Sequence, residues 1–308
     1  MTLESWMQFL NSTLAAAAPI ALAALGAVFA FRAGIYFLGL EGLMLIGAFS
    51  AVGVTVSTQS VGLGLVAAVV ASIVGAALFW LVVVVFGADQ IVAGLGLSIL
   101  GLGLTSYGLT ALFQSPGSLY VENGLWRPLT GDVQGVAVLF RDLSVLVWAT
   151  PVIVLLCWVL TTRTHFGLKV TTVGEYPFAA RAAGVSPARV RLQALVLCGV
   201  LCGLAGAELS LGQLRAFTEN ITQGSGFIAF SAAIFGSAMP IGTAISSLFF
   251  GLANALGIQT QLETEGLNIP RELILAVPYL LTIAAVWYAS ARRKGRAGLV
   301  GFGELRDG

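Results

Sequence analysis

Charged residues are scarce in this chain of 308 residues, in which Asp, Glu, Lys and Arg together make up 9% and hydrophobic residues 58%. Soluble proteins carry about 25% charged residues, so this composition excludes a water-soluble domain of any size. It indicates instead a membrane protein that crosses the bilayer several times. The few basic residues border the apolar runs, which argues against a nucleic-acid-binding surface.

Residues suited to catalysis or metal binding are also scarce. His165 is the only histidine, which excludes a histidine-based metal cluster. The three cysteines, Cys157, Cys198 and Cys202, fall inside apolar runs and are typical of small buried hydrophobic residues rather than of disulfides or metal ligands. We find no GxSxG, HExxH or GxxxxGK[ST] motif and no pair of intramembrane carboxylates at helical spacing. We therefore predict no catalytic residue, metal or cofactor on this chain.

Apolar runs long enough to span a bilayer recur along the sequence, at about 20 residues and about 1.5 Å per residue for each span. They predict an all-α polytopic membrane protein with about eight to ten transmembrane helices, some of them broken, in a single domain over residues 1–308. The nine predicted spans cover residues 13–31, 34–56, 61–86, 91–113, 143–160, 192–214, 227–239, 241–258 and 272–290. The seventh of these is short, and it either crosses the membrane or forms half of a broken helix.

Basic residues predict the orientation, because Lys and Arg near membrane spans stay on the cytoplasmic side. Ten of the fifteen lie in two short segments, residues 161–191 and the tail 291–308. Both segments are therefore expected in the cytoplasm, and nine crossings then leave the N-terminus outside. The polar connection 114–142 is also expected outside.

The polar segment 161–191 carries signals for a short helix. Pro177 suits a first helical turn, Gly184 suits the position just after a helix end, and the residues between them are mostly good helix formers. Ser186, followed by a proline, is typical of the N-cap of the next helix. Small residues and few charges on this helix would let another protein pack closely against it. The alternative is a solvated loop that only connects two spans.

Glu41 lies in the sequence Gly39-Leu40-Glu41-Gly42 within an apolar run. A charge in the bilayer centre costs about 2.5–3.5 kcal/mol on insertion scales and usually faces a cavity or a partner. The flanking glycines suggest irregular backbone, so one interpretation is a broken helix at a substrate pathway. The alternative is that Glu41 lies near the cytoplasmic end of its helix and pairs with Arg32.

Three further features are candidates for a site. Glu208 follows two small residues late in the sixth predicted span and either lines an outer vestibule or pairs with Arg215. Asn254, in an apolar span, either hydrogen-bonds between helices or touches a polar ligand. The sequence QGSGF, which ends at Phe227, would begin a helix after glycines and present free backbone N–H groups.

Glycine is abundant, with 38 residues, and its spacing is regular in one span. Gly94, Gly101 and Gly108 recur every seven residues, as do Gly96 and Gly103. Small residues at such spacing let membrane helices approach closely. We interpret both rows as packing surfaces of a tight helix bundle rather than as ligand sites.

Several motifs together resemble one family. They are GLEGLMLIGAF at residues 39–49, GADQIVAG at 87–94, the segment from Phe166 to Val185, and GFIA with IFG before Pro240. Over residues 17–290 the chain resembles permease subunits of bacterial ABC importers for nucleosides and simple sugars. These belong to the wider family that includes ribose and branched-chain amino acid permeases.

The resemblance implies a multi-pass subunit of the bacterial cytoplasmic membrane that hydrolyses nothing itself. Its partners would be an ABC ATPase that holds ATP-Mg, a second permease subunit in a heterodimer, and an extracytoplasmic substrate-binding protein. Tyr176 stands where an Asn is common in the family. The residues expected at the substrate pathway are Glu41, Gly39, Gly42, Asn254 and Phe227. Those expected to couple to the ATPase are Gly174, Glu175, Pro177, Ala180, Arg181 and Gly184.

Two other classes of function remain as alternatives. A self-sufficient secondary transporter or channel for a small polar solute would need its own coupling device, but the sequence shows neither a carboxylate relay nor obvious inverted repeats. A membrane enzyme would need a catalytic cluster, which the sequence lacks.

Overall fold

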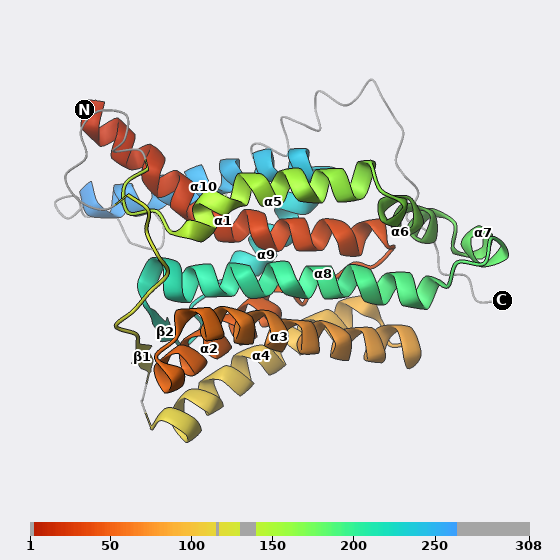
Figure 1. Ribbon diagram of the computed structural model, residues 1–308, viewed down its shortest axis with the longest axis horizontal. Coiled ribbons are helices and arrows are strands. Elements are labelled where there is room, and N and C mark those ends of the chain that lie inside the picture. Colours follow the sequence, from red (N-terminus) through yellow and green to blue (C-terminus); the bar gives the residue numbers. More distant parts are fainter. Residues whose placement is uncertain (1–2, 115–116, 130–139, 264–308) are drawn as a thin grey trace. The chain divides into compact units, whose positions relative to one another are not determined.

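The computed structural model describes residues 3–114, 117–129 and 140–263 (Figure 1). The chain divides into two compact units, Met1–Leu252 and Ala253–Gly308. The predicted ninth span at 272–290 and the tail 291–308 lie outside the described residues. The prediction of a single domain stays a prediction, and the packing reported below is that of the first unit.

Seven helices in the described residues are long and apolar enough to cross a membrane. They are α1 (Leu3–Arg32), α2 (Leu40–Thr58), α3 (Val61–Trp80) with its π-helical extension η1 (Leu81–Val85), α4 (Gln90–Phe113), α5 (Val145–Thr162), α8 (Pro187–Ala207) with its π-helical extension η3 (Glu208–Leu214), and α10 (Pro240–Glu263). The prediction of a polytopic α-helical membrane protein is confirmed.

Shorter elements connect these helices. They are β1 (Ser118–Tyr120), α6 (His165–Glu175), α7 (Pro177–Ala182), β2 (Ala216–Thr218) and α9 (Ser225–Phe235). β1 and β2 pair antiparallel, with Leu119 opposite Phe217. In Figure 1 this strand pair lies at one end of the first unit and α7 at the opposite end, and we call these the β1–β2 end and the α7 end.

The centre of the first unit is α8, which packs against α1, α2 and α3 (Figure 1). Its glycines bring these helices close. An added Cβ at Gly199 would lie 2.9 Å from the Ser72 carbonyl oxygen, and one at Gly203 would lie 2.7 Å from that of Ala68. Such close backbone approach is how membrane helices gain dispersion energy without help from the hydrophobic effect. By contrast, α3, α4 and α5 expose most of their apolar surface, as helices that face lipid do.

The two glycine rows of α4 have different surroundings. Gly94, Gly101 and Gly108 face α2 and the residues just before it. A Cβ at Gly101 would lie 2.8 Å from the Gly42 Cα. A Cβ at Gly96 or Gly103 would meet nothing within 4 Å. The packing prediction is therefore confirmed for the first row, whereas the second row is open on the outer face of α4.

Candidate functional site

The first turn of α2 lies at mid-level in the bundle. Gly42 contacts Gly101, and Gly101 is the twelfth of the 24 residues of α4. Gly42 therefore lies beside the middle of α4. The preceding residues 34–39 are not helical, and a Cβ at Gly94 would lie 3.0 Å from the Leu38 nitrogen. The predicted span 34–56 therefore starts with extended chain and becomes helical only about halfway along α4.

Glu41, at this level, binds the beginning of α9. Its carboxylate accepts hydrogen bonds from the backbone N–H groups of Gly224 (2.8 Å) and Gly226 (2.6 Å) and from the hydroxyl of Thr222. The side chain is only 5% exposed. A carboxylate at a helix N-terminus satisfies N–H groups that have no partner within the helix and interacts favourably with the helix dipole. Glu41 therefore caps α9 and joins it to α2.

The proposed pairing of Glu41 with Arg32 is not what the structure shows. Arg32 donates from Nε to the Ala238 carbonyl oxygen at 2.8 Å, in the turn between α9 and α10. Among the described residues the one ion pair joins Arg141 and Asp142. The physical reason is that Glu41 lies at mid-level with backbone donors at hand, whereas Arg32 ends α1 at the α7 end.

α9 is a half-length helix. It has 11 residues, which rise about 16 Å, whereas the hydrocarbon core of a bilayer is about 30 Å thick. It begins beside Glu41 and runs towards the α7 end, where Arg32 holds the turn that follows it. Residues 215–224 lead from the β1–β2 end to its start. The short seventh predicted span thus corresponds to a half-length helix that follows non-helical chain.

The residues predicted at a substrate pathway occupy different environments. Gly39 and Gly42 are buried at contacts with α4, and a Cβ at Gly42 would lie 2.8 Å from the Ser98 Cα. Phe227, in the first turn of α9, is 41% exposed. Asn254 lies on α10 within the second unit and is half-buried. The structure thus brings Glu41, its glycines and the start of α9 together.

A second buried carboxylate belongs to Glu208, where α8 becomes the π-helix η3. It is 1% exposed and accepts a hydrogen bond from the Ser144 hydroxyl at 2.5 Å. Its Oε1 has no partner among the described residues. Arg215, the partner suggested by the sequence, is exposed and ends η3. A cation does lie nearby, because Arg127 donates to the carbonyl oxygen of Gly212, four residues after Glu208 in η3.

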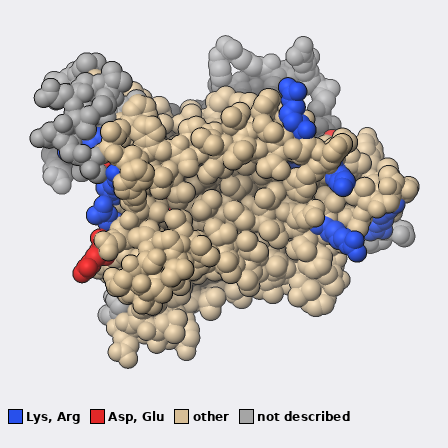
Figure 2. All heavy atoms as spheres, viewed as in Figure 1, with Lys and Arg blue, Asp and Glu red and all other residues tan. Residues whose placement is uncertain are grey.

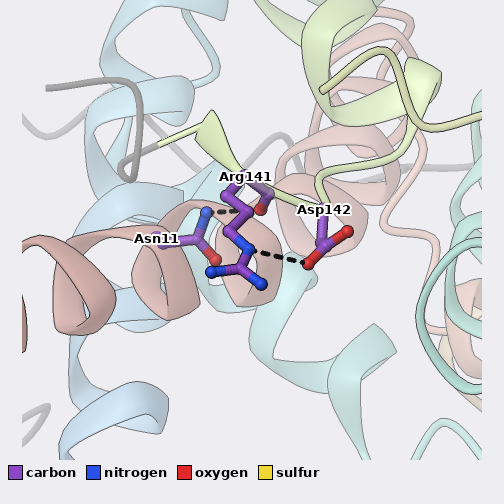
Figure 3. Close-up of polar contacts among 3 residues, drawn as sticks. All are labelled: Asn11, Arg141 and Asp142. Carbon is purple, nitrogen blue, oxygen red and sulfur yellow. Dashed lines mark hydrogen bonds and ion pairs between the residues drawn. The ribbon is translucent and has the colours of Figure 1, made fainter. Parts of the chain in front are cut away.

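The connection between α4 and α5 covers η3 at the β1–β2 end. Leu125 donates its backbone N–H to the Leu211 carbonyl oxygen at 3.0 Å, and Arg127 donates from Nη2 to that of Gly212 at 2.9 Å. The connection is also tied to α1, because the Asn11 amide donates to the Arg141 carbonyl oxygen at 2.9 Å (Figure 3). Sequence reasoning missed Ser144 and Arg127, because 64 residues separate Ser144 from Glu208 and no local pattern links them.

The helix predicted from Pro177 and Gly184 is present as α7. Pro177 occupies its first turn, and Gly184 follows its end with φ of +79°. Ala180 is buried, whereas Glu175 and Arg181 are exposed. The surface is not made of small residues alone, because Tyr176 and Phe178 are 67% and 70% exposed. Lys and Arg side chains gather around this end of the first unit (Figure 2): Arg163, Lys169, Arg181 and Arg189.

Gly174, near the end of α6, is packed against the connection between α1 and α2. A Cβ there would overlap the Arg32 carbonyl oxygen and lie 3.0 Å from the Gly34 nitrogen. Arg191, in the first turns of α8, donates to the Ala33 carbonyl oxygen at 3.4 Å. The end of α6 is therefore in direct contact with the turn after α1. Arg32 in that turn is hydrogen-bonded to Ala238, just after α9.

These features define a multi-pass α-helical membrane protein with a half-length helix in its core and an exposed basic segment at one end. Residues 9–286 match the family described as branched-chain amino acid transport system / permease component, and the chain belongs to this family. No solved structure matches the chain.

Relatives with known names are permease proteins. The chain is 32% identical to the guanosine ABC transporter permease protein NupQ of Bacillus subtilis, over 89% of each chain. It is 31% identical to the nucleoside ABC transporter permease protein NupC of Lactococcus lactis, over 86% of each chain. It is 30% identical to the putative glucose ABC transporter permease protein TsgC13 of Haloferax volcanii, over 92% of each chain. These relatives are transport subunits rather than enzymes.

Proposed function

We propose that the chain is the transmembrane permease subunit of an ATP-driven importer that moves nucleosides or related ribosyl or simple-sugar compounds across the bacterial cytoplasmic membrane. The observation that carries this proposal is the family match over residues 9–286, together with nucleoside permeases among the relatives. Its partners would be an ABC ATPase that binds ATP-Mg, a second permease subunit in a heterodimer, and an extracytoplasmic binding protein.

The proposed orientation puts the α7 end in the cytoplasm and the β1–β2 end outside. The basic residues around α6 and α7 support it, because such residues remain on the cytoplasmic side. Nine crossings, including the segment 272–290, would then leave the N-terminus outside and the tail 291–308 inside. The connection between α4 and α5 would face the binding protein.

The ATPase would dock on the exposed side chains of α7 and its flanks, which include Tyr176 and Phe178. A movement of this segment would reach the core by contact, first from Gly174 to the turn at Arg32. From there the hydrogen bond between Arg32 and Ala238 would carry it to the end of α9. Such coupling works only if these contacts differ between the inward- and outward-facing states.

The proposal is tested with the complex taken from its native membrane in mild detergent. Recovery of an ATPase and a second permease with this chain, together with nucleoside uptake that stops when ATP is depleted, is the expected result. Uptake that survives ATP depletion but collapses with the ion gradient would overturn it and favour a secondary transporter.

The coupling role is tested at Gly184. A Gly184→Val variant should lose at least about tenfold in uptake while remaining in the membrane, because a β-branched residue at φ of +79° is strained and the end of α7 must shift. A Cβ at Gly184 meets nothing within 4 Å, so the effect comes from the backbone alone. Ala183→Val is the control, since Ala183 is exposed with φ of −82°. Unchanged uptake in Gly184→Val refutes the coupling role.

A further inference from the structure

The segment that leads into α9 exposes polar side chains although it reaches the middle of the bundle. Asn220 and Gln223 are exposed, with φ of +54° and +44°. Gln223 directly precedes Gly224, whose N–H binds Glu41. Gln223 therefore lies close to the level of Glu41 and Gly42, which is the middle of α4.

The backbone of this segment satisfies many of its own polar groups. Gln223 N–H donates to the Asn220 carbonyl oxygen at 3.0 Å, and Ser225 N–H donates to that of Thr222 at 2.8 Å. Thr222 itself is buried and turned onto Glu41. The chain thus alternates, with Thr222 directed into the protein and Gln223 directed out of it.

Irregular backbone at membrane depth is not found facing lipid, but occurs where it is buried in protein or lines a water-filled cavity. An exposed amide side chain at this depth should not face lipid either, because its hydrogen-bonding groups would have no partner in hydrocarbon. Gln223 is exposed on this chain rather than buried within it. We therefore infer that Asn220, Gln223 and Phe227 form one wall of an aqueous solute pathway and contact the solute as it passes the middle of the membrane.

The chemistry of this wall, taken with the proposed function on which this step rests, favours an uncharged nucleoside. The Gln223 and Asn220 amides supply both donors and acceptors for hydroxyl groups and base edges. Phe227, four residues after Gln223, offers a partly exposed ring on which a flat base can stack. These three side chains carry no charge.

The capping of α9 points the same way. In many transporters the free N-terminus of a broken helix attracts an anionic part of the substrate. Here the carboxylate of Glu41 already occupies that position. Glu219, exposed just before Asn220, adds another negative charge. Nucleotides and other phosphorylated compounds should therefore be excluded from this wall.

The first experiment tests the aqueous pathway without reference to any substrate. Cys157, Cys198 and Cys202 are all buried, so a membrane-impermeant maleimide should label the unmodified protein weakly. In the assembled transporter in membranes, a Gln223→Cys variant should be labelled. Ile99→Cys should not be, because Ile99 is 72% exposed on the outer face of α4 and would face lipid. A Gln223→Cys variant that stays unlabelled from both sides of the membrane overturns the pathway assignment.

The second experiment tests contact with the solute. Phe227→Ala should lower guanosine uptake about tenfold, as expected from the loss of base stacking, and should lower ribose uptake much less, because ribose has no base. Gln223→Leu should lower the uptake of both compounds. The controls are Phe249→Ala, at a phenylalanine that is 39% exposed, and Gln59→Leu, at an exposed glutamine with φ of +56°. Both control variants should take up the two compounds at the normal rate.

Two outcomes distinguish this inference from the proposed function. If the unmodified complex takes up neither compound, the proposed function fails. If it takes up guanosine and both the Gln223→Leu and Phe227→Ala variants transport at the normal rate, the proposed function stands and the contact assignment is wrong.

Discussion

Glu41 and Glu208 look alike in the sequence and differ in the structure. Each is a carboxylate within an apolar helix next to small residues, and each is at most 5% exposed. Glu41 accepts three hydrogen bonds that occupy both of its oxygens. Glu208 accepts one, from Ser144, and its Oε1 has no partner in the part of the chain that the structure describes. Burial alone therefore does not determine what a membrane carboxylate does.

The two sites also differ in what they connect. Glu41 joins the beginnings of α2 and α9 at mid-level, where a change would disturb two core helices at once. Glu208 lies where α8 becomes η3, beneath the connection that carries Arg127. The Nε of Arg127 is also buried without a partner among the described residues. We therefore expect Glu41 to act as a fixed structural contact and Glu208 to tolerate change.

The largest effect is expected from Glu41→Ala. It would leave the Gly224 and Gly226 N–H groups and the Thr222 hydroxyl without an acceptor, and each buried unsatisfied group costs about 1–3 kcal/mol. The midpoint of thermal unfolding of the purified complex should fall strongly, and the amount of protein in the membrane should fall with it. Glu41→Gln, which keeps one acceptor oxygen, should be intermediate. An unchanged midpoint for Glu41→Ala would show that the cap contributes little.

A smaller but clear loss is expected from Gly226→Ala. The added Cβ would overlap the Glu41 nitrogen and lie 2.5 Å from the Glu41 Cα. Because backbone cannot move aside as a flexible side chain does, α9 must shift away from α2, at a cost of about 1–3 kcal/mol. Gly103→Ala is the matched control, since its Cβ meets nothing within 4 Å, and alanine there should be neutral or slightly stabilising. Equal melting temperatures for the two variants would contradict this account.

Local signals in the sequence predicted local structure well. Pro177 and Gly184 bound α7 as expected, and the apolar runs became long helices, because caps and hydropathy depend on neighbours in the chain. The glycine row at Gly94, Gly101 and Gly108 also predicted a packed face. The equivalent row at Gly96 and Gly103 is open, since sequence spacing does not say which face of a helix has a neighbour.

The partners of buried charges could not be predicted in this way. The sequence suggested Arg32 for Glu41 and Arg215 for Glu208, which are the nearest basic residues along the chain. The structure supplies uncharged donors instead, and those of Glu41 lie 181 to 185 residues away. Backbone N–H groups at a helix N-terminus satisfy a carboxylate without the cost of removing a second ion from water. The π-helical form of η3 gave no local signal either.

The smallest effect is expected from Glu208→Gln, and it tests the comparison most directly. The amide oxygen of Gln still accepts from Ser144, while the change removes a buried charge that has only one hydrogen bond. Holding an incompletely paired ion in the protein interior costs several kcal/mol of desolvation, so its removal offsets the contacts that are lost, and the free energy of unfolding should change by less than about 1 kcal/mol. Ser144→Ala should cost more, because Ser144 also caps α5 by accepting from the Val147 N–H at 3.3 Å. If Glu208→Gln destabilises the complex as much as Glu41→Gln, then the loss of stability depends on the burial of the carboxylate and not on the number of hydrogen bonds that it accepts.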